Sequence, residues 1–354
     1  MRVVFSGLQW PKNLTGVHKS TVNLALSLRC SSENVTVAFI IDQELNILPR
    51  LNLAGIQVID CRISNRGSKS ELLRQWSPEI FVSDYPSPSC TLPRHCKKVL
   101  RVHDCLPLEI PGYLGRNPIR RCSYIARLLS GTLRSSLVIT NSYYSQKQLK
   151  RYLSIESMVI PNTFKAAPSQ DPALPRSGYL YVGGFDPRKN IEALIVEFNR
   201  LYIQGFVKEK LVVAGSPEHL YPSLEKLISK AVKLGSVVCT GYLSESELIQ
   251  YYKSSRALVY PSTYEGFGMP VLEAMSYGCP VISTPFTSIP EVGGDSILYF
   301  DPNITGSLAS QIMLLENSSE LCSSLSMLGL RQAKIFSYEN VGALLYRQLA
   351  SLLP

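Results

Sequence analysis

A glycine-bearing loop between an apolar run and a short helix constrains the fold of this chain more than any other stretch. Residues 257–260 predict a buried strand, Pro270 suits the start of a helix, and Gly278, followed by a proline, predicts its end near residue 277. A second apolar run, 281–283, follows at once. The order strand, loop, helix, strand predicts a parallel α/β sheet, and it presents backbone N–H groups at a helix N-terminus, where an anion such as phosphate is favoured.

Two glutamates frame this loop. Glu265 precedes the helix and Glu273 is expected in its first turn, so both carboxylates can face one ligand. Because two carboxylates would repel a phosphate, hydroxyl groups are their better partners. The alternative is that Glu273 only favours the helix dipole and that Glu265 is a solvated loop residue.

Length and composition favour a globular protein of two domains. The sequence has 354 residues, which suits two cores of about 150–200 residues each. It contains no run of about 18 apolar residues and no leader-like segment before its first strand-like run, so we expect a cytoplasmic protein without a spanning helix. The nine cysteines are scattered without a C-x-x-C pair, which argues against both a disulfide framework and a zinc site.

The positive charge is concentrated in one stretch. The formal net charge is +9, and residues 94–151 alone carry twelve Lys and Arg against two acidic residues. This stretch predicts an anionic partner such as a membrane surface, a lipid phosphate or nucleic acid, the alternative being a solvated basic face. Ile119, Tyr124, Leu128 and Leu129 alternate with Arg116, Arg120, Arg121 and Arg127, which predicts an amphipathic helix whose apolar face meets a membrane or packs inward.

The remaining chain alternates between strand-like and helix-like runs. Strands are predicted at 2–6, 35–41, 56–60, 80–83, 99–102 and 137–140, and again at 178–182, 211–215 and 237–240. This alternation indicates parallel sheets covered on both faces. The stretch 161–177 carries four prolines and no apolar period, so it is interpreted as a linker between two such domains. A helical stripe from residue 341 ends the chain.

Polar residues follow two of these strands, where ligands of open α/β sheets bind. His103 comes directly after the run 99–102, although a structural role is the alternative for a single histidine. Arg188 and Lys189 lie in the turn 183–190 beyond another strand. Two adjacent cations suit a diphosphate, Arg as a planar fork and Lys as a compact charge.

Several strings resemble segments of one enzyme family. The string E-G-F-G-x-P-x-L-E-A-M at 265–275, followed by G-C-P-V-I, resembles the nucleotide-sugar motif of the family 4 retaining glycosyltransferases. H-D-x-x-P-L at 103–108 and I-P-N at 160–162 resemble further segments of that family. The resemblance covers nearly the whole chain. It implies two Rossmann-like domains facing a cleft, the GT-B architecture: an acceptor-side domain at 1–163, a nucleotide-sugar domain at 164–335, and a helix at 336–354 that crosses back.

The resemblance also implies roles for single residues. Glu273 would bind the ribose hydroxyls, Glu265 the transferred sugar, and His103 the C6 hydroxyl of that sugar, while Lys189 would hold the diphosphate. The family arginine is missing at Gly184, so Arg188 either replaces it or points elsewhere. The candidate catalytic residues are His103, Arg188, Lys189 and Glu265. The expected donor-binding residues are Gly16, Gly183, Gly241, Tyr242, Gly266, Phe267, Gly268, Met269, Val271, Leu272 and Glu273.

The favoured function is that of a retaining, metal-independent glycosyltransferase. By resemblance, it moves a hexose, with mannose from GDP-mannose as the preferred candidate, to a glycan or lipid-linked acceptor in cell-surface polysaccharide synthesis. No cofactor is expected, and the basic stretch 94–151 favours a peripheral place on the inner face of the membrane. Alternatives are a nucleotide-sugar epimerase or an inactive homologue of the same fold. A nucleic-acid-binding protein is disfavoured because no aromatic residues are interleaved with the basic ones on a strand platform.

Overall fold

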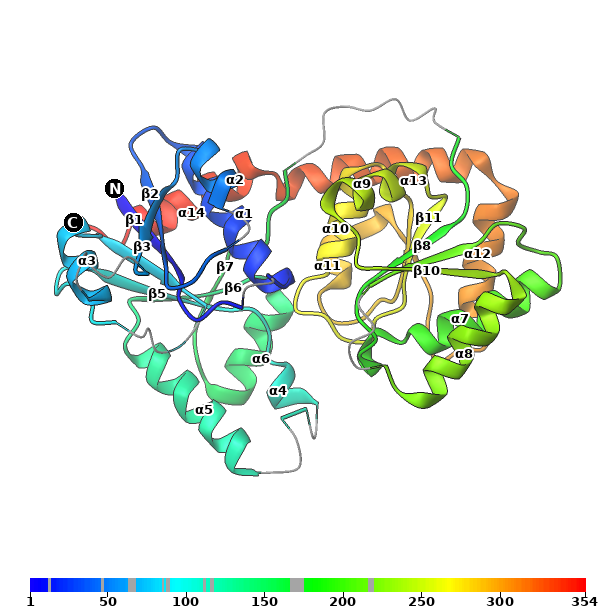
Figure 1. Ribbon diagram of the computed structural model, residues 1–354, viewed down its shortest axis with the longest axis horizontal. Coiled ribbons are helices and arrows are strands. Elements are labelled where there is room, and N and C mark those ends of the chain that lie inside the picture. The colour runs from blue at the N-terminus through cyan, green and yellow to red at the C-terminus, as the bar shows by residue number, and fades with distance from the viewer. Residues whose placement is uncertain are drawn as a thin grey trace. The chain divides into compact units, whose positions relative to one another are not determined.

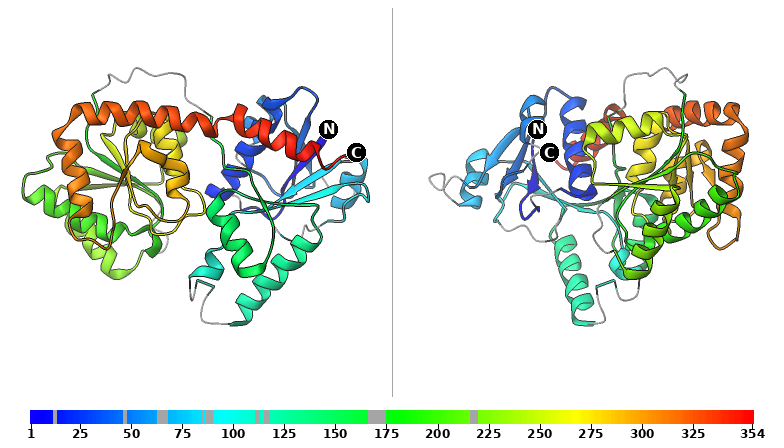
Figure 2. Two further views of the ribbon diagram at one scale, coloured as in Figure 1. Left: turned by 180° about the vertical axis from the view of Figure 1, so that it is seen from behind. Right: turned by 45° about the vertical axis from the view of Figure 1, so that its right-hand side comes forward.

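The computed structural model describes residues 1–11, 14–45, 48–62, 68–84, 86, 90–110, 113–114, 118–165, 175–215 and 220–354. It divides into two compact units, Met1–Lys165 together with Phe336–Pro354, and Ala166–Ile335. Each unit is a parallel sheet with helices on both faces, as the different views show (Figures 1 and 2). Of the predicted linker 161–177, residues 166–174 lie outside the described residues.

The first unit is built on a seven-stranded sheet in the order β3-β2-β1-β4-β5-β6-β7. Every predicted strand of this half forms, with ends that shift by two residues at most. The strands are β1 (Arg2–Gly7), β2 (Thr36–Ile41), β3 (Gln57–Asp60), β4 (Ile80–Ser83), β5 (Lys97–Val102), β6 (Leu137–Thr140) and β7 (Met158–Val159). The two-residue β7 was not predicted, because so short a run has no measurable period.

Helices of the first unit cover both faces of that sheet. They are α1 (Gly16–Ser31), α2 (Leu48–Leu53), α3 (Lys69–Trp76), α4 (Leu106–Glu109), α5 (Pro118–Leu133), α6 (Tyr143–Leu153) and the last helix, α14 (Tyr338–Ala350). The largest apolar core of this unit combines side chains from β1, β2, α1 and α14. The C-terminal stripe predicted from the sequence therefore packs into the core of the first unit, through Val341, Leu345 and Leu349.

The second unit has a six-stranded sheet in the order β10-β9-β8-β11-β12-β13. Its strands are β8 (Tyr179–Val182), β9 (Leu211–Ala214), β10 (Val237–Gly241), β11 (Ala257–Tyr260), β12 (Val281–Ser283) and β13 (Leu298–Tyr299). Its α-helices are α7 (Ile191–Ile203), α8 (Pro222–Leu234), α9 (Glu245–Ser254), α10 (Met269–Ser276), α11 (Ile289–Gly293), α12 (Ser307–Asn317) and α13 (Ser319–Ala333). The order makes β8 and β11 neighbours in the middle of the sheet.

No helix in the described ranges has both the length and the apolar character needed to cross a membrane.

The contact between α1 and α14 depends on a glycine. Figure 2 shows α14, in red, beside α1, in blue. Gly342 is buried there, and a Cβ atom built on it would lie 2.2 Å from the backbone oxygen of Ser27. Real Cβ atoms do not approach a carbonyl oxygen so closely, so only glycine lets the two backbones meet.

Gly342→Ala is expected to lower the free energy of unfolding by about 1–3 kcal/mol, because the added methyl group forces the helices apart. Helix propensity alone predicts the opposite sign, since alanine is about 1 kcal/mol better than glycine within a helix. Urea denaturation of the whole chain measures the change. The control is Ala343→Gly at the exposed neighbouring position, which tests propensity without packing. A more stable Gly342→Ala variant would contradict the close helix contact.

Candidate active site

The carboxyl ends of β8 and β11 bring the predicted catalytic residues of the second unit together. The two strands pair in parallel, with Ala257 opposite Tyr179. Arg188 and Lys189 follow β8 in a single 3₁₀ turn, Pro187–Lys189, and the loop that carries Glu265 follows β11. Because parallel neighbours end at the same edge of a sheet, residues 76 or 77 positions apart in the sequence come into contact.

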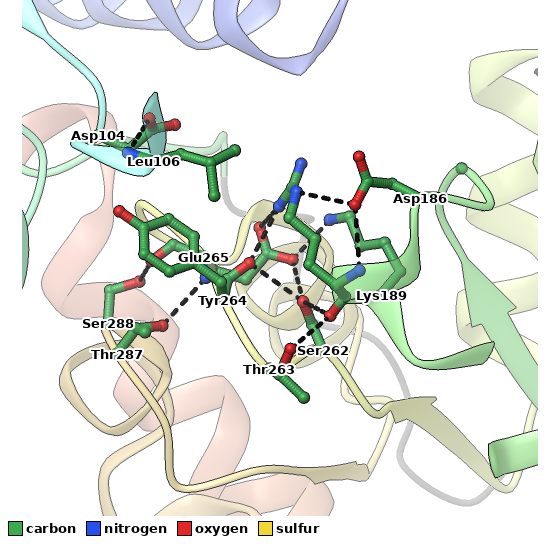
Figure 3. A network of polar contacts seen from close by, with 12 residues as sticks. Asp104, Leu106, Asp186, Lys189, Ser262, Thr263, Tyr264, Glu265, Thr287 and Ser288 are labelled. Atoms are coloured by element: carbon green, nitrogen blue, oxygen red, sulfur yellow. Dashed lines mark hydrogen bonds and ion pairs between the residues drawn. The ribbon is translucent and has the colours of Figure 1, made fainter. Parts of the chain in front are cut away.

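Glu265 is the centre of a dense polar network (Figure 3). Its Oε1 accepts three hydrogen bonds, from Lys189 Nζ at 2.5 Å, Ser262 Oγ at 2.6 Å and the Tyr260 hydroxyl at 2.7 Å. Its Oε2 lies 3.5 Å from Arg188 Nη1. Among the described residues, the network gives one carboxylate oxygen three donors and the other a single, longer contact to a cation.

The main chain on both sides of this network is also held in place. The Glu265 backbone N–H donates to Thr287 Oγ1 at 3.0 Å, and its carbonyl oxygen accepts from Ser288 Oγ at 2.9 Å. Arg188 Nη1 donates to the Tyr264 carbonyl oxygen at 2.9 Å. Side chains from three loops thus fix both the position and the direction of the Glu265 carboxylate.

Electrostatics keep Glu265 ionised although it is buried. Burial alone would raise the pKa of this carboxyl, but the nearby charges of Lys189 and Arg188 outweigh it and hold the pKa below its ordinary value. Burial, and then the charge of Glu265, raise the pKa of Tyr260 well above the ordinary range, so its hydroxyl stays protonated and can only donate to that oxygen. The site therefore holds a fixed anion between two cations.

The loop before α10 ends at Gly268, which caps the N-terminus of this helix. Gly268 caps the helix with φ +100°, and a Cβ there would lie 2.7 Å from Ile289 Cδ1, so only glycine fits. The backbone N–H groups of Val271 and Leu272 already donate to the Gly268 carbonyl oxygen, at 3.0 and 3.3 Å. Their apolar side chains are fully buried. The N–H of Met269 has no partner among the residues that the structure describes, so it is the better candidate for an anion.

Glu273 lies in α10, but not where the sequence placed it. The helix begins at Met269, one residue earlier than expected, so Glu273 is its fifth residue and lies beyond the first turn. The prediction of a first-turn position was therefore wrong, because the glycine cap starts the helix before Pro270. The Glu273 carboxylate is half-buried and accepts a hydrogen bond of 2.9 Å from the Tyr252 hydroxyl of α9.

The remaining predicted donor-binding residues of the second unit follow other strand ends. Gly183 directly follows β8, and Gly184 beside it has open space where a side chain would stand. Gly241 ends β10 with φ +70°, and Tyr242 after it is 73% exposed. Gly266 is half-buried, whereas Phe267 is buried. These positions share the carboxyl edge of one sheet.

In the first unit, the structure places His103 in a network that the sequence analysis missed. His103 Nε2 lies 2.8 Å from Asp84 Oδ1, and Thr21 Oγ1 donates to both oxygens of Asp84, at 3.0 and 2.9 Å. Gly16, the other predicted residue of this unit, is the exposed first residue of α1. A signal for Asp84 was present, because it directly follows β4 just as His103 follows β5.

Arg101 is a second residue that the sequence analysis did not assign to a site. It is the second-to-last residue of β5 and is fully buried, with Nη1 2.7 Å from Thr21 Oγ1 and Nη2 2.5 Å from Asn162 Oδ1. Burial lowers the pKa of Arg101 to about 10, while Asp84 opposes the shift, so the guanidinium stays charged at neutral pH. A charged residue within the apolar run 99–102 was the signal for this buried network.

The basic stretch 94–151 exposes fewer charged side chains than its composition suggests. Arg101 is buried, and so is Lys98, whose Nζ donates to the Pro86 carbonyl oxygen at 2.5 Å. Two of the twelve basic residues counted toward a surface are therefore internal. Arg116 lies outside the described residues.

The described residues contain no cluster of three or more His, Cys, Asp or Glu side chains arranged to hold a metal ion.

The chain resembles known glycosyltransferases in sequence. Residues 169–329 match the family model described as glycosyl transferases group 1. The chain is 33% identical over 275 residues to O-antigen chain mannosyltransferase B of Escherichia coli, which covers 72% of this chain and 71% of the relative. It is 27% identical to the O-antigen chain mannosyltransferase RfbU of Salmonella typhimurium, with 64% of this chain covered and 63% of the relative. It spans only 34% of the serotype-specific mannosyltransferase WbdA of Escherichia coli, at 28% identity.

Solved structures share the fold over the whole chain. HepE of Anabaena, solved with UDP and glucose, matches with a TM-score of 0.74 and 16% identity, covering 99% of this chain and 100% of that one. Sucrose-phosphate synthase from Thermosynechococcus elongatus matches with the same TM-score, identity and coverage. The predicted α/β class with two Rossmann-like units of the GT-B type is confirmed. The chain therefore belongs to the group 1 glycosyl transferases, and it is a glycosyltransferase.

Proposed function

We propose that this enzyme transfers mannose from GDP-mannose to a glycan or lipid-linked acceptor, with retention of the anomeric configuration and without a metal ion, in the synthesis of a cell-surface polysaccharide. The choice of mannose rests on the relatives, of which O-antigen chain mannosyltransferase B matches over most of both chains. The choice of chemistry rests on the geometry at the ends of β8 and β11.

The observation that carries the proposal is the contact of two cations with one fixed carboxylate. An ammonium group has three N–H donors, and Lys189 directs two of them to Tyr260 and Glu265. Among the described residues the third has no partner, so we assign it to a phosphate oxygen. Arg188 and Lys189 would then stabilise the charge that builds on the diphosphate as it leaves, a role in which preorganised donors are most effective.

The same carboxylate suits the transferred sugar. Oε1 of Glu265 is saturated by three donors, so Oε2 is the oxygen that we assign to a sugar hydroxyl. The N–H of Met269 would add a donor for the diphosphate, and Glu273 would accept from the ribose hydroxyls. Gly241 and Tyr242 would lie against the nucleobase. His103 would contact the C6 hydroxyl of the sugar.

With these roles, the proposed transfer would need no metal ion. Two side-chain cations and a helix N-terminus supply the positive charge that a bound cation would otherwise provide. For retention without a carboxylate nucleophile, we propose attack on the same face of the sugar from which the diphosphate leaves.

The direct test is a transfer assay with GDP-mannose, UDP-glucose and UDP-galactose as donors, in excess EDTA. We expect mannose transfer to extracted lipid-linked glycans to persist with EDTA, and proton NMR of the product to show the α configuration of the donor. A strict requirement for Mg²⁺ or Mn²⁺, or an inverted product, would contradict the mechanism. Transfer only from UDP-hexoses would contradict the proposed donor.

Lys189→Ala is expected to lower kcat by about 10²-fold or more, as for other donors that stabilise transition-state charge. Arg188→Ala should cost less, because its guanidinium is engaged with the Tyr264 carbonyl oxygen and lies farther from Glu265. Lys230→Ala, at an exposed position of α8, controls for loss of one positive charge. Steady-state kinetics measure kcat for those variants whose circular dichroism spectrum matches that of the wild type. An unchanged kcat in both the Lys189 and the Arg188 variant would contradict the proposed contact with the diphosphate.

A membrane-facing surface is the second part of the proposal. The predicted amphipathic helix forms as α5, but Tyr124, Leu128 and Leu129 pack inward against the core of the first unit. Exposed residues at seven-residue spacing remain, which we call the α5 stripe: Arg120 and Arg127 of α5 and Arg134 directly after it. Ile119 and Leu133 lie beside them in the sequence and are 72% and 87% exposed. Charge, helped by two apolar side chains, would therefore attach this unit to anionic lipid.

Binding of the α5 stripe to anionic vesicles is expected to be reversible and sensitive to salt, since each basic residue near such a surface contributes about 1 kcal/mol. Co-sedimentation with vesicles of phosphatidylglycerol and phosphatidylcholine, at low and high salt, measures it. Arg120→Glu/Arg127→Glu should abolish binding, whereas Lys226→Glu/Lys230→Glu, an equal charge change on exposed positions of α8, should retain it. Equal binding by both double variants would rule the stripe out.

A further inference from the structure

Asp84 is a buried carboxylate that the proposed mechanism does not use. Its side chain is 3% exposed at the end of β4, in the first unit. Oδ1 lies 2.8 Å from His103 Nε2, and both oxygens accept from Thr21 Oγ1. A buried carboxylate is costly unless its charge is compensated, and these contacts supply that compensation.

The carboxylate is held in its ionised form. Burial would raise the pKa of Asp84, but His103, the guanidinium of Arg101 and the hydrogen bond from Thr21 together hold it below the ordinary value. Arg101 Nη1 lies 3.9 Å from Oδ1 and also donates to Thr21 Oγ1. An ionised carboxylate has no proton to donate, so the contact at 2.8 Å requires the hydrogen to be on His103 Nε2.

This contact determines what the other side of the imidazole can do. Two anchors hold the residue, since Ser145 Oγ donates to the His103 carbonyl oxygen at 3.2 Å while Asp84 holds the ring. In the part of the chain that the structure describes, Nδ1 of His103 has no hydrogen-bond partner. With the hydrogen on Nε2 held by Asp84, Nδ1 is an acceptor in the neutral ring and a donor in the imidazolium form.

We propose that Asp84 is a positioning residue for the transfer reaction, which fixes His103 in the Nε2–H tautomer so that Nδ1 accepts a hydrogen bond from a hydroxyl of the donor sugar. This inference rests on the proposed function, in which His103 contacts the transferred sugar. Thr21 and Arg101 hold Asp84 in turn, and Asn162 holds Arg101, so the ring orientation is supported by α1, β4 and β5. A sugar with a hydroxyl at this point would be preferred over its deoxy analogue.

The tautomer is measured directly by ¹⁵N NMR of the wild-type chain at neutral pH. The sequence has only four histidines, so a His103→Gln spectrum suffices to assign the signals. We expect the shift of a protonated Nε2 and an unprotonated Nδ1 for His103, and a mixture of tautomers in Asp84→Asn, whose amide can both donate and accept. A proton on Nδ1 in the wild type would overturn the proposal, whether or not any variant folds.

A double-mutant cycle then tests whether Asp84 acts through His103. Asp84→Asn and His103→Ala are each expected to lower kcat/KM for the sugar donor about tenfold or more, and the double variant should be no worse than His103→Ala alone. Losses that multiply in the double variant would show that Asp84 acts independently of His103 and would refute the positioning role.

Substrate choice gives a readout that a purely structural Asp84 would not move. Wild type should discriminate between GDP-mannose and its 6-deoxy analogue, and Asp84→Asn should lose that discrimination while nucleotide affinity, measured calorimetrically with GDP, stays the same. Equal discrimination in both proteins would overturn the inference. An absence of transferase activity in the wild type would refute the proposed function instead, and the NMR result would still report the tautomer.

Discussion

The contact between Lys189 and Glu265 is the interaction on which the second unit's chemistry depends. Their charged atoms lie 2.5 Å apart, and the side chains are 13% and 10% exposed. Removing one partner of such a buried pair costs about 3–5 kcal/mol, because the other charge is left uncompensated. The pair therefore locks the turn after β8 to the loop after β11, and the sheet order that makes these strands neighbours brings a cation and a carboxylate together.

The first unit uses the same principle with different residues. Asp84 follows β4. The neighbouring strand β5 contains Arg101 and is followed by His103, and α1 supplies Thr21. In both units, basic side chains and hydroxyl groups contact a carboxylate that lies beyond a strand end. A buried polar network is destabilising when some of its groups lack hydrogen-bond partners. Each network therefore depends on a sheet edge that holds these groups in place. The backbone contact at Gly342 belongs to the same unit and supplies part of that rigidity through α14.

The strands and the central loop could be predicted because their signals are local. Apolar runs mark β4 and β6 to the residue, and the glycines and prolines around α10 mark its ends to within one residue. The partners of Glu265 could not be predicted in the same way. In the sequence, Tyr260 is predicted only to end a strand and Ser262 to lie in the loop after it. The pairing of β8 with β11 is what brings Lys189 to them. Asp84 and Arg101 were missed because a buried ion pair across two strands leaves no periodic pattern.

The burial of Lys189 also determines how strongly this side chain can attract an anion. Coulomb interactions increase as the surrounding dielectric falls, so a cation that is 13% exposed attracts a phosphate more strongly than one in bulk water. Glu265 offsets part of that attraction and at the same time holds Lys189 charged and in place. Asp186, 3.6 Å from Arg188 Nε, is 33% exposed, and water screens its effect. Because the inner carboxylate is fixed by Tyr260 and Ser262, the diphosphate of the proposed reaction would meet cations whose positions are already set. Little reorganisation would then remain for the moment when the sugar–phosphate bond breaks.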